Sequence, residues 1–196
     1  MKKPEIQNGR ELYHFTALDN LPSILGSKLR PRKELTDFTD VADKEILEGR
    51  DKFSLDKMVP FHFFPNNPFD GKVCKLHPTT KFAFIVVRRA IAKENEWKIT
   101  PRHPLSGDCK LMTYDEGMKA IDWQTMNEKD FKKPESKLIC MAECLSPEAV
   151  APSTFHAIYV ATEKDKQEVQ KIVKENDLRM FVEVKPFYFP SCYKLK

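Results

Sequence analysis

Glycine is scarce in this sequence, with 6 residues among 196, and no glycine-rich phosphate loop can be assembled from it. The patterns GxGxxG and GxxxxGKS/T are both absent, which excludes the usual Rossmann and P-loop cradles for a nucleotide. No apolar run approaches the roughly 18–20 residues that a membrane span needs. The N-terminus has two lysines but no apolar stretch after them, so it does not resemble a secretory signal. We therefore expect a cytoplasmic protein with no membrane partner.

Cysteine is also sparse, with five residues in total and no pair at CxxC spacing. An odd count in a chain of this size does not suggest a disulfide framework. Cys140 and Cys144 would share one face of a strand if the run around them is extended. No His or Cys pair lies nearby in the sequence to complete a tetrahedral site, so we expect no metal.

Charge of either sign is nearly balanced. Lys plus Arg come to 33 and Asp plus Glu to 29, which leaves a formal net charge of +4. This value permits an acidic partner such as nucleic acid but does not demand one. The length suits one globular domain, and we expect residues 1–196 to form it.

Short apolar runs and helical periodicities alternate irregularly along the chain, with long polar connections between them. This order favours an α+β fold over a doubly wound α/β fold, which needs regular strand–helix alternation. We expect polar or turn-rich loops over 29–40 and 65–80, a short helical turn over 146–152, and a charged linker from 124 to Pro134. The predicted strands are 11–16, 58–64, 81–89, 137–145, 155–162 and 180–189. The predicted helices are 17–29, 41–54, 113–123 and 163–176.

Polar residues at the end of the first predicted strand form one candidate site. His14 and Thr16 share a strand face because side chains alternate, and Asn20 follows closely. Such residues can line a cleft, although a solvated edge strand explains them more simply.

Two charged residues are further candidates. Glu143 lies in the apolar run LICMAECL, where a carboxylate is costly unless it is paired or lines a cavity. A functional role and an exposed strand face explain it about equally well. Arg50 sits near the end of a predicted helix and offers a fork for phosphate or carboxylate, although a solvated helix end is the simpler explanation.

Several stretches of the sequence form a recognisable series. They are LYHFTALDNLPSILGSKL (12–29), EILEGR ending at Arg50, MVPFHFFPNNP (58–68), AIDW (120–123) and MAECLSPEAVAPSTFHAIYVAT (141–162). Together they resemble the DarT family of bacterial toxins, which attach ADP-ribose from NAD to DNA bases. They occur in the same order as in that family and cover about residues 11–162.

The resemblance implies an ADP-ribosyltransferase-like split mixed β core with peripheral helices and long loops. It implies NAD as the ADP-ribose donor without a metal, single-stranded DNA as acceptor, and a macrodomain-type antitoxin as partner. By the same resemblance, Glu143 and Arg50 are the catalytic residues. The predicted NAD-binding residues are His14, Thr16, Asn20 and Leu29.

The sequence departs from the family pattern near the predicted acceptor site. His62 replaces a tyrosine in VPFYF, Met141 replaces a glutamine before Ala-Glu, and FDGKVC follows NNP in place of a PMLY-like run. Thymine is the first expectation for the acceptor base and guanine the second. The alternatives are a transferase that acts on RNA or protein, an enzyme that only hydrolyses NAD, and a non-catalytic binding domain of the same fold. The aromatic residues Phe61, Phe63, Phe64 and Tyr114 could stack on bases, but a core position explains them equally well.

Overall fold

A seven-stranded sheet forms the centre of the protein in a computed structural model, which describes residues 5–36, 38–39, 54–104, 106, 110–191 and 193. The strand order is β4-β5-β2-β1-β3-β6-β7, and all neighbours pair antiparallel except β6 and β7, which are parallel. The strands are β1 (Glu11–Ala17), β2 (Val59–His62), β3 (Phe82–Arg88), β4 (Lys98–Thr100), β5 (Glu143–Ser146), β6 (Phe155–Val160) and β7 (Phe181–Val184).

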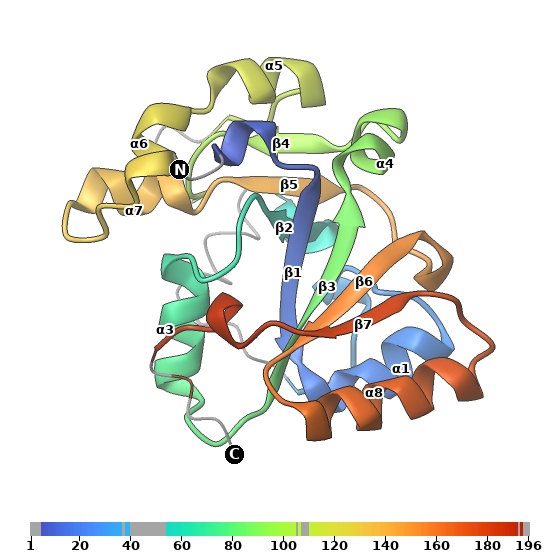
Figure 1. Cartoon of the computed structure of the whole chain (residues 1–196). Helices are drawn as coiled ribbons and strands as arrows, with labels where there is room; N and C mark the ends of the chain where they lie inside the picture. The colour runs from blue at the N-terminus through green and yellow to red at the C-terminus, as the bar shows by residue number, and fades with distance from the viewer. Residues whose placement is uncertain are drawn as a thin grey trace.

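The sheet is split between β1 and β2. These two strands share a single register pair, Tyr13 with His62, whereas every residue of β1 has a partner on β3. In Figure 1, β4 and β5 run across the top of the molecule, whereas β1 and β3 lie roughly upright below them and point in opposite directions. The sheet therefore has two parts that are joined at the Tyr13–His62 pair. One part contains β4, β5 and β2, and the other contains β1, β3, β6 and β7.

Helices surround this sheet in separate groups. In Figure 1, α5, α6 and α7 gather around β4 and β5, α1 and α8 lie together at the opposite end, and α3 stands to one side. The helices are α1 (Leu21–Gly26), α3 (Pro68–Leu76), α4 (Arg89–Glu94), α5 (Tyr114–Ala120), α6 (Trp123–Glu128), α7 (Pro134–Cys140) and α8 (Glu163–Glu175). Short 3-10 turns complete the fold: η1 (Ile6–Asn8), η2 (Leu18–Asn20), η3 (Arg32–Glu34), η4 (Leu55–Lys57), η5 (Pro152–Thr154) and η6 (Pro186–Tyr188).

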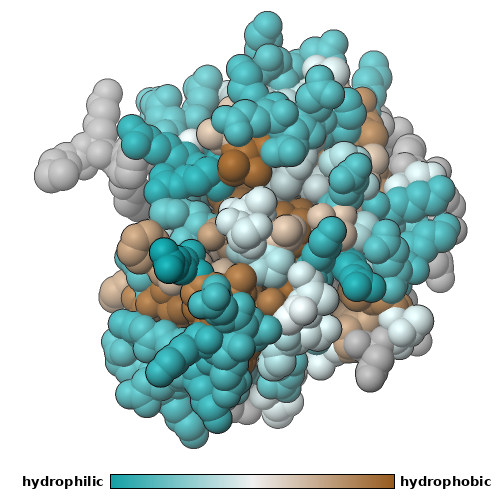
Figure 2. Space-filling view, turned by 90° about the vertical axis from the view of Figure 1, so that its right-hand side faces the viewer, coloured by the Kyte–Doolittle hydropathy of each residue, from teal (hydrophilic) through white to brown (hydrophobic). Residues whose placement is uncertain are grey.

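Two apolar clusters cover the two faces of the sheet. The larger contains Leu12 and Ile85, and the smaller contains Tyr13, Phe15 and Phe84. Neighbouring residues of one strand thus enter different clusters, as strand alternation requires. On the surface, Figure 2 shows hydrophilic residues over most of one side, with hydrophobic atoms visible between them. No helix in the described part of the chain is long and apolar enough to cross a membrane.

The structure confirms the α+β class and most predicted elements but corrects several. The run 137–145 was predicted as one strand, yet α7 occupies its first half and β5 begins only at Glu143. Pro134 is compatible with the first turn of α7, and this helix places Cys140 on a different element from Cys144.

Two predicted connections are helical as well. The loop 65–80 contains α3, which begins with a capping box between Asn67 and Asp70. The linker from 124 to Pro134 begins with α6, which Asp122 caps through a hydrogen bond to the backbone N–H of Thr125. Both capping residues lie in stretches rich in turn-forming or charged residues. The composition of these stretches favoured a loop, so the helices were not predicted. The helical turn expected over 146–152 lies later, as η5, and the predicted helix 41–54 falls mostly outside the described residues.

Candidate active site

The split in the sheet opens next to His14. Beyond the Tyr13–His62 pair, β1 no longer bonds β2, and the His14 side chain takes over the contact. Its Nδ1–H donates to the carbonyl oxygen of Pro60 at 2.8 Å, and its ring lies 5.6 Å from that of Phe61. This bond assigns the proton to Nδ1, so the Nε2 of a neutral ring is a hydrogen-bond acceptor.

A cavity of about 920 Å³ lies along this split. Its volume is at the upper end of the range of about 300–1,000 Å³ for small-molecule sites. Strands β1, β2 and β5, helix α1 and the segment 28–39 all contribute to its walls. The predicted residues His14, Thr16, Asn20, Leu29 and Glu143 all line it, although they are spread over 130 positions of the sequence.

Glu143 enters the cavity from the first position of β5. Its side chain is only 5% exposed, and its register partner on β2 is His62. The short turn from α7 into β5 is held at Ala142, whose N–H donates to Ile139 and whose carbonyl oxygen accepts from the Nδ1–H of His62 at 3.2 Å. A glutamate at the end of a strand and in the wall of a cavity can contact a bound ligand without a large movement of the backbone.

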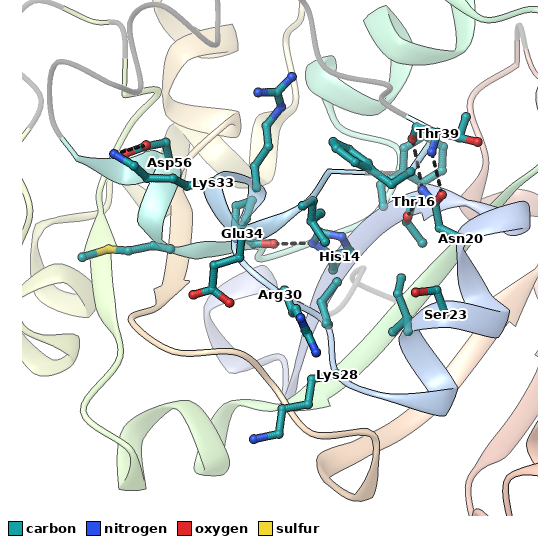
Figure 3. A pocket seen from close by; sticks show the side chains of 18 of the residues that line it. His14, Thr16, Asn20, Ser23, Lys28, Arg30, Lys33, Glu34, Thr39 and Asp56 are labelled. Atoms are coloured by element: carbon teal, nitrogen blue, oxygen red, sulfur yellow. Dashed lines mark hydrogen bonds and ion pairs between the residues drawn. The ribbon is translucent and has the colours of Figure 1, made fainter.

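Asn20 joins the first strand to the segment that covers the cavity. Its side-chain amide donates to the Thr39 carbonyl oxygen at 3.1 Å and accepts from the Thr39 N–H at 2.9 Å. The same amide donates to Oγ1 of Thr16 at 3.2 Å. Figure 3 shows these three residues side by side at one end of the pocket. Asn20 therefore acts as an anchor for the covering segment, in addition to lining the cavity.

Leu29 is held at the beginning of the same segment. Its backbone forms a two-bond bridge with Val150, at 2.9 Å and 2.8 Å, and its side chain is buried. This bridge fixes the start of the covering segment, and the Asn20–Thr39 bonds fix its end. Leu29 thus contributes an apolar wall rather than a polar contact.

Basic side chains crowd the covering segment between these two anchors. Four of them line the cavity: Lys28, Arg30, Arg32 and Lys33. Lys33 pairs with Asp56 at 3.4 Å, and the Arg32 guanidinium lies 5.8 Å from the centre of the Phe38 ring. Figure 3 shows Arg30 below His14, with the end of Lys28 farther down and directed away from His14. The carboxylates of Asp19, Glu34 and Asp56 line the cavity too. The basic groups can therefore bind a phosphate or diphosphate locally, but the wall as a whole is not basic.

The structure also shows cavity residues that were not among the predicted site residues. Pro60 and His62 on β2 and Met58 just before it alternate along the chain and line the cavity together, and His103 lines it from the loop after β4. The resemblance had placed only His62 near the site. Period-two alternation in MVPFHF was the available signal, but it does not show which face is buried. Phe61, Phe63, Phe64 and Tyr114 are all buried in the larger apolar cluster, so they are core residues. Arg50 lies outside the described residues.

A buried carboxyl group lies in α3, next to a residue that lines the cavity. Phe69 lines the cavity, and burial raises the pKa of the adjacent Asp70 to about 8, although the backbone N–H groups of Asn66 and Asn67 lower it. Among the described residues, no group of three or more His, Cys, Asp or Glu side chains is placed to hold a metal ion.

Comparison with known proteins agrees with this geometry. A family described as "ssDNA thymidine ADP-ribosyltransferase, DarT" matches residues 13–191. Thermus sp. 2.9 DarT in complex with ADP-ribosylated ssDNA superposes with a TM-score of 0.81 at 22% identity, covering 96% of this chain and 100% of that one. The same protein in complex with NAD+ gives a TM-score of 0.75 at 20% identity, with 96% and 100% coverage. The split sheet and its cavity therefore define a chain with the ADP-ribosyltransferase fold.

A curated relative extends this classification. A DNA ADP-ribosyl transferase–DNA ADP-ribosyl glycohydrolase fusion protein from Thermosipho africanus (strain H17ap60334) is 26% identical, covering 93% of this chain and 50% of the relative. The chain thus spans about half the length of this curated relative. The chain belongs to the DarT family, because the family match extends over most of its length. The predicted family and fold are confirmed.

Proposed function

We propose that this protein transfers ADP-ribose from NAD+ to a thymine base of single-stranded DNA. The observation that carries the proposal is the position of Glu143, a buried carboxylate at the end of the split cavity, in a chain of the DarT family. Family membership supports thymine as the acceptor, and the basic side chains of the covering segment are compatible with the phosphates of both substrates.

The chemistry matches the groups that line the cavity. The bond between the nicotinamide nitrogen and the ribose carbon breaks, nicotinamide leaves with the electron pair, and positive charge develops on the ribose. A carboxylate that accepts a hydrogen bond from a ribose hydroxyl stabilises this charge more in the transition state than in the ground state. The base then attacks the same carbon, and Glu143 takes the proton that the base loses.

The other predicted residues have supporting roles in this proposal. His14 and Thr16 bind the nicotinamide end of NAD+, and Leu29 provides the apolar wall beside it. Asn20 holds the covering segment over the donor through its bonds to Thr39. Arg50 is proposed as the second catalytic residue, on the sequence resemblance alone.

A partner is part of the proposal. The Thermosipho africanus relative joins a transferase to a DNA ADP-ribosyl glycohydrolase in one chain. We infer that this transferase is the toxin of a toxin–antitoxin pair, countered by a macrodomain-type glycohydrolase that removes ADP-ribose from DNA. Both NAD+ and DNA are substrates inside the cell, so the enzyme is proposed to act in the cytoplasm.

Mass spectrometry of oligonucleotides tests the function directly. The protein is incubated with NAD+ and four single-stranded DNA pools, each lacking one base, and with an RNA pool. We expect a mass gain of one ADP-ribose in every DNA pool except the one without thymine. Glu143→Gln should abolish this gain, whereas Glu148→Gln, the same change on an exposed residue after β5, should leave it intact.

Other outcomes would redirect the proposal. A gain lost only in the pool without guanine would change the acceptor base. Consumption of NAD+ with no nucleic-acid adduct would indicate a protein acceptor or hydrolysis, and adducts on RNA alone would replace DNA as the acceptor. No consumption of NAD+ would make the chain a binding domain.

A further inference from the structure

A row of three buried residues crosses the sheet at Glu143. His62 on β2, Glu143 on β5 and Thr100 on β4 are consecutive register partners. Residues directly opposite each other point to the same face of a sheet, with Cβ atoms about 4.5–5.5 Å apart. The Thr100 hydroxyl therefore lies on the same face as the Glu143 carboxylate and on the side away from His62.

The Thr100 hydroxyl is unusual in its surroundings. The residue is 0% exposed, and within the described part of the chain its Oγ1 has no hydrogen-bond partner. A buried hydroxyl without a partner is unfavourable, and valine would fill the same space without that penalty. Because this hydroxyl lies next to the Glu143 residue on the neighbouring strand, it can donate a hydrogen bond to a carboxylate, which valine cannot do.

Strand β4 is held firmly, so Thr100 keeps its place relative to Glu143. The preceding residue, Ile99, exchanges two backbone hydrogen bonds with Met112 on the outer side of β4, at 3.0 Å and 2.9 Å. Helix α5 presses on the same residue so closely that a Cβ at Gly117 would lie 2.3 Å from the Cβ of Ile99. After Thr100, Arg102 binds Glu135 of α7 at 2.6 Å, which ties the strand to the helix that leads into Glu143.

We propose that Thr100 is a positioning residue, which rests on the proposed function of Glu143. This hydroxyl has no hydrogen-bond partner among the described residues. When NAD+ binds, it donates a hydrogen bond to one carboxylate oxygen of Glu143 while the other oxygen binds the ribose hydroxyl. This bond holds the carboxylate in one rotamer during the departure of nicotinamide. Thr100 does not line the cavity and does not touch NAD+ or DNA.

Kinetics of three variants test this role. Thr100→Val removes the hydroxyl at nearly constant volume, and we expect kcat to fall about tenfold while the KM for NAD+ stays within twofold, since one hydrogen bond to a charged group is lost. Thr100→Ser keeps the hydroxyl and should restore kcat. Ile99→Val is the matched control, because it perturbs packing of the same strand on the opposite face; it should lower the thermal midpoint but leave kcat unchanged.

A wild-type kcat in Thr100→Val, or a kcat in Thr100→Ser as low as in Thr100→Val, would overturn the inference. If Thr100→Val does not fold, Thr100→Cys takes its place, with a weaker donor and an expected kcat between those of serine and valine. If the unmodified protein transfers nothing to DNA, the proposed acceptor is wrong. The role of Thr100 is then measured on NAD+ hydrolysis, which also depends on Glu143.

Discussion

Two buried charges, Arg89 and Glu143, have opposite surroundings in this molecule. Arg89 is 6% exposed at the start of α4, and its guanidinium lies over the rings of Phe63 and Trp123 at 5.1 Å and 5.8 Å. Its nitrogens donate at 3.0–3.2 Å to four backbone carbonyl oxygens, those of Ile6, Gln7, Glu11 and Phe63. Glu143 is equally buried but faces a cavity of about 920 Å³.

The difference separates a charge whose partners are protein groups from a cavity-lining residue that we propose to be catalytic. Arg89 uses its donors on the backbone and ties the N-terminal turn η1 to the centre of the sheet. Burial lowers its pKa, but an arginine stays protonated in a protein. Glu143 instead directs its carboxylate where a ligand can reach it. Changes at the first residue should therefore affect stability, and changes at the second should affect activity.

The largest expected effect is on activity, at Glu143. Glu143→Gln should reduce kcat at least about 10³-fold, or about 4 kcal/mol in the barrier, because the amide neither balances the positive charge nor accepts the proton. Its free energy of unfolding should be unchanged or higher, since burying a neutral amide is easier than burying a carboxylate. Steady-state kinetics and urea unfolding measure the two quantities. A variant that loses stability together with activity would remove the contrast with Arg89.

The next effect is on stability, at Arg89. Arg89→Met should lower the free energy of unfolding by about 3–5 kcal/mol, because several buried carbonyl oxygens lose their donors at once. Urea unfolding of this variant is compared with Arg179→Met, the same change at an exposed position, which should stay within about 0.5 kcal/mol. The kcat of folded Arg89→Met should remain near that of the unmodified protein. Equal stability of the two variants would contradict the structural role of Arg89.

His14 should show an intermediate effect, on substrate use. His14→Phe preserves a ring beside Phe61 but removes the donor to the Pro60 carbonyl oxygen. We expect kcat/KM for NAD+ to fall about 10–30-fold, equivalent to about 2 kcal/mol, mainly through a higher KM. His77→Phe, which lies outside the cavity lining, provides the control. Normal saturation by NAD+ in His14→Phe would exclude His14 from the donor site.

The last prediction concerns a third buried ionisable residue, Asp70. Burial raises the pKa of Asp70 to about 8, whereas the unfolded chain releases this proton near an ordinary pKa of about 3.9. The folded state therefore holds a proton that the unfolded state has lost, and the free energy of unfolding falls as the pH rises from about 4 to about 8.

Asp70→Asn should flatten that part of the stability profile. The side-chain oxygen of asparagine can still accept from the Asn67 N–H, so the cap of α3 is preserved. We expect the stability of the variant relative to the unmodified protein to be clearly greater at pH 8 than at pH 4. Urea unfolding at the two values measures the difference, and an equal difference at both would show that Asp70 does not titrate in this range.

Local patterns were sufficient for much of the fold. The strand 81–89 was predicted because β-branched and aromatic residues fill it, and the helix 163–176 because Thr162 and Asp165 have the spacing of a capping box. In the structure, the Thr162 hydroxyl accepts a hydrogen bond from the Asp165 N–H. The run 137–145 was misread because its apolar residues suit a buried helix as well as a buried strand. Periodicity over so few residues does not distinguish the two, and contacts with α6 are what place α7.

For the candidate site too, the sequence predicted some residues, whereas other contacts are seen only in the structure. Glu143 stood out because a carboxylate in an apolar run needs a reason, and His14 and Thr16 because they share a strand face. The role of Asn20 as an anchor could not be read from the sequence, since it depends on Thr39. The pairing of His62 and Thr100 with Glu143 was not predicted, although the resemblance placed His62 near the acceptor site, because strand register, not spacing along the chain, brings them together.

The sequence by itself determined the class of the fold, the family and the identity of the predicted site residues in the described part of the chain. Composition, alternation and capping act between near neighbours, so one chain contains that information without reference to its fold. Only the tertiary structure decided where the sheet splits and which side chains meet there. Strand pairing joins Tyr13 to His62, 49 positions along the chain, and His62 to Glu143, a further 81 positions along, and no local preference encodes that meeting.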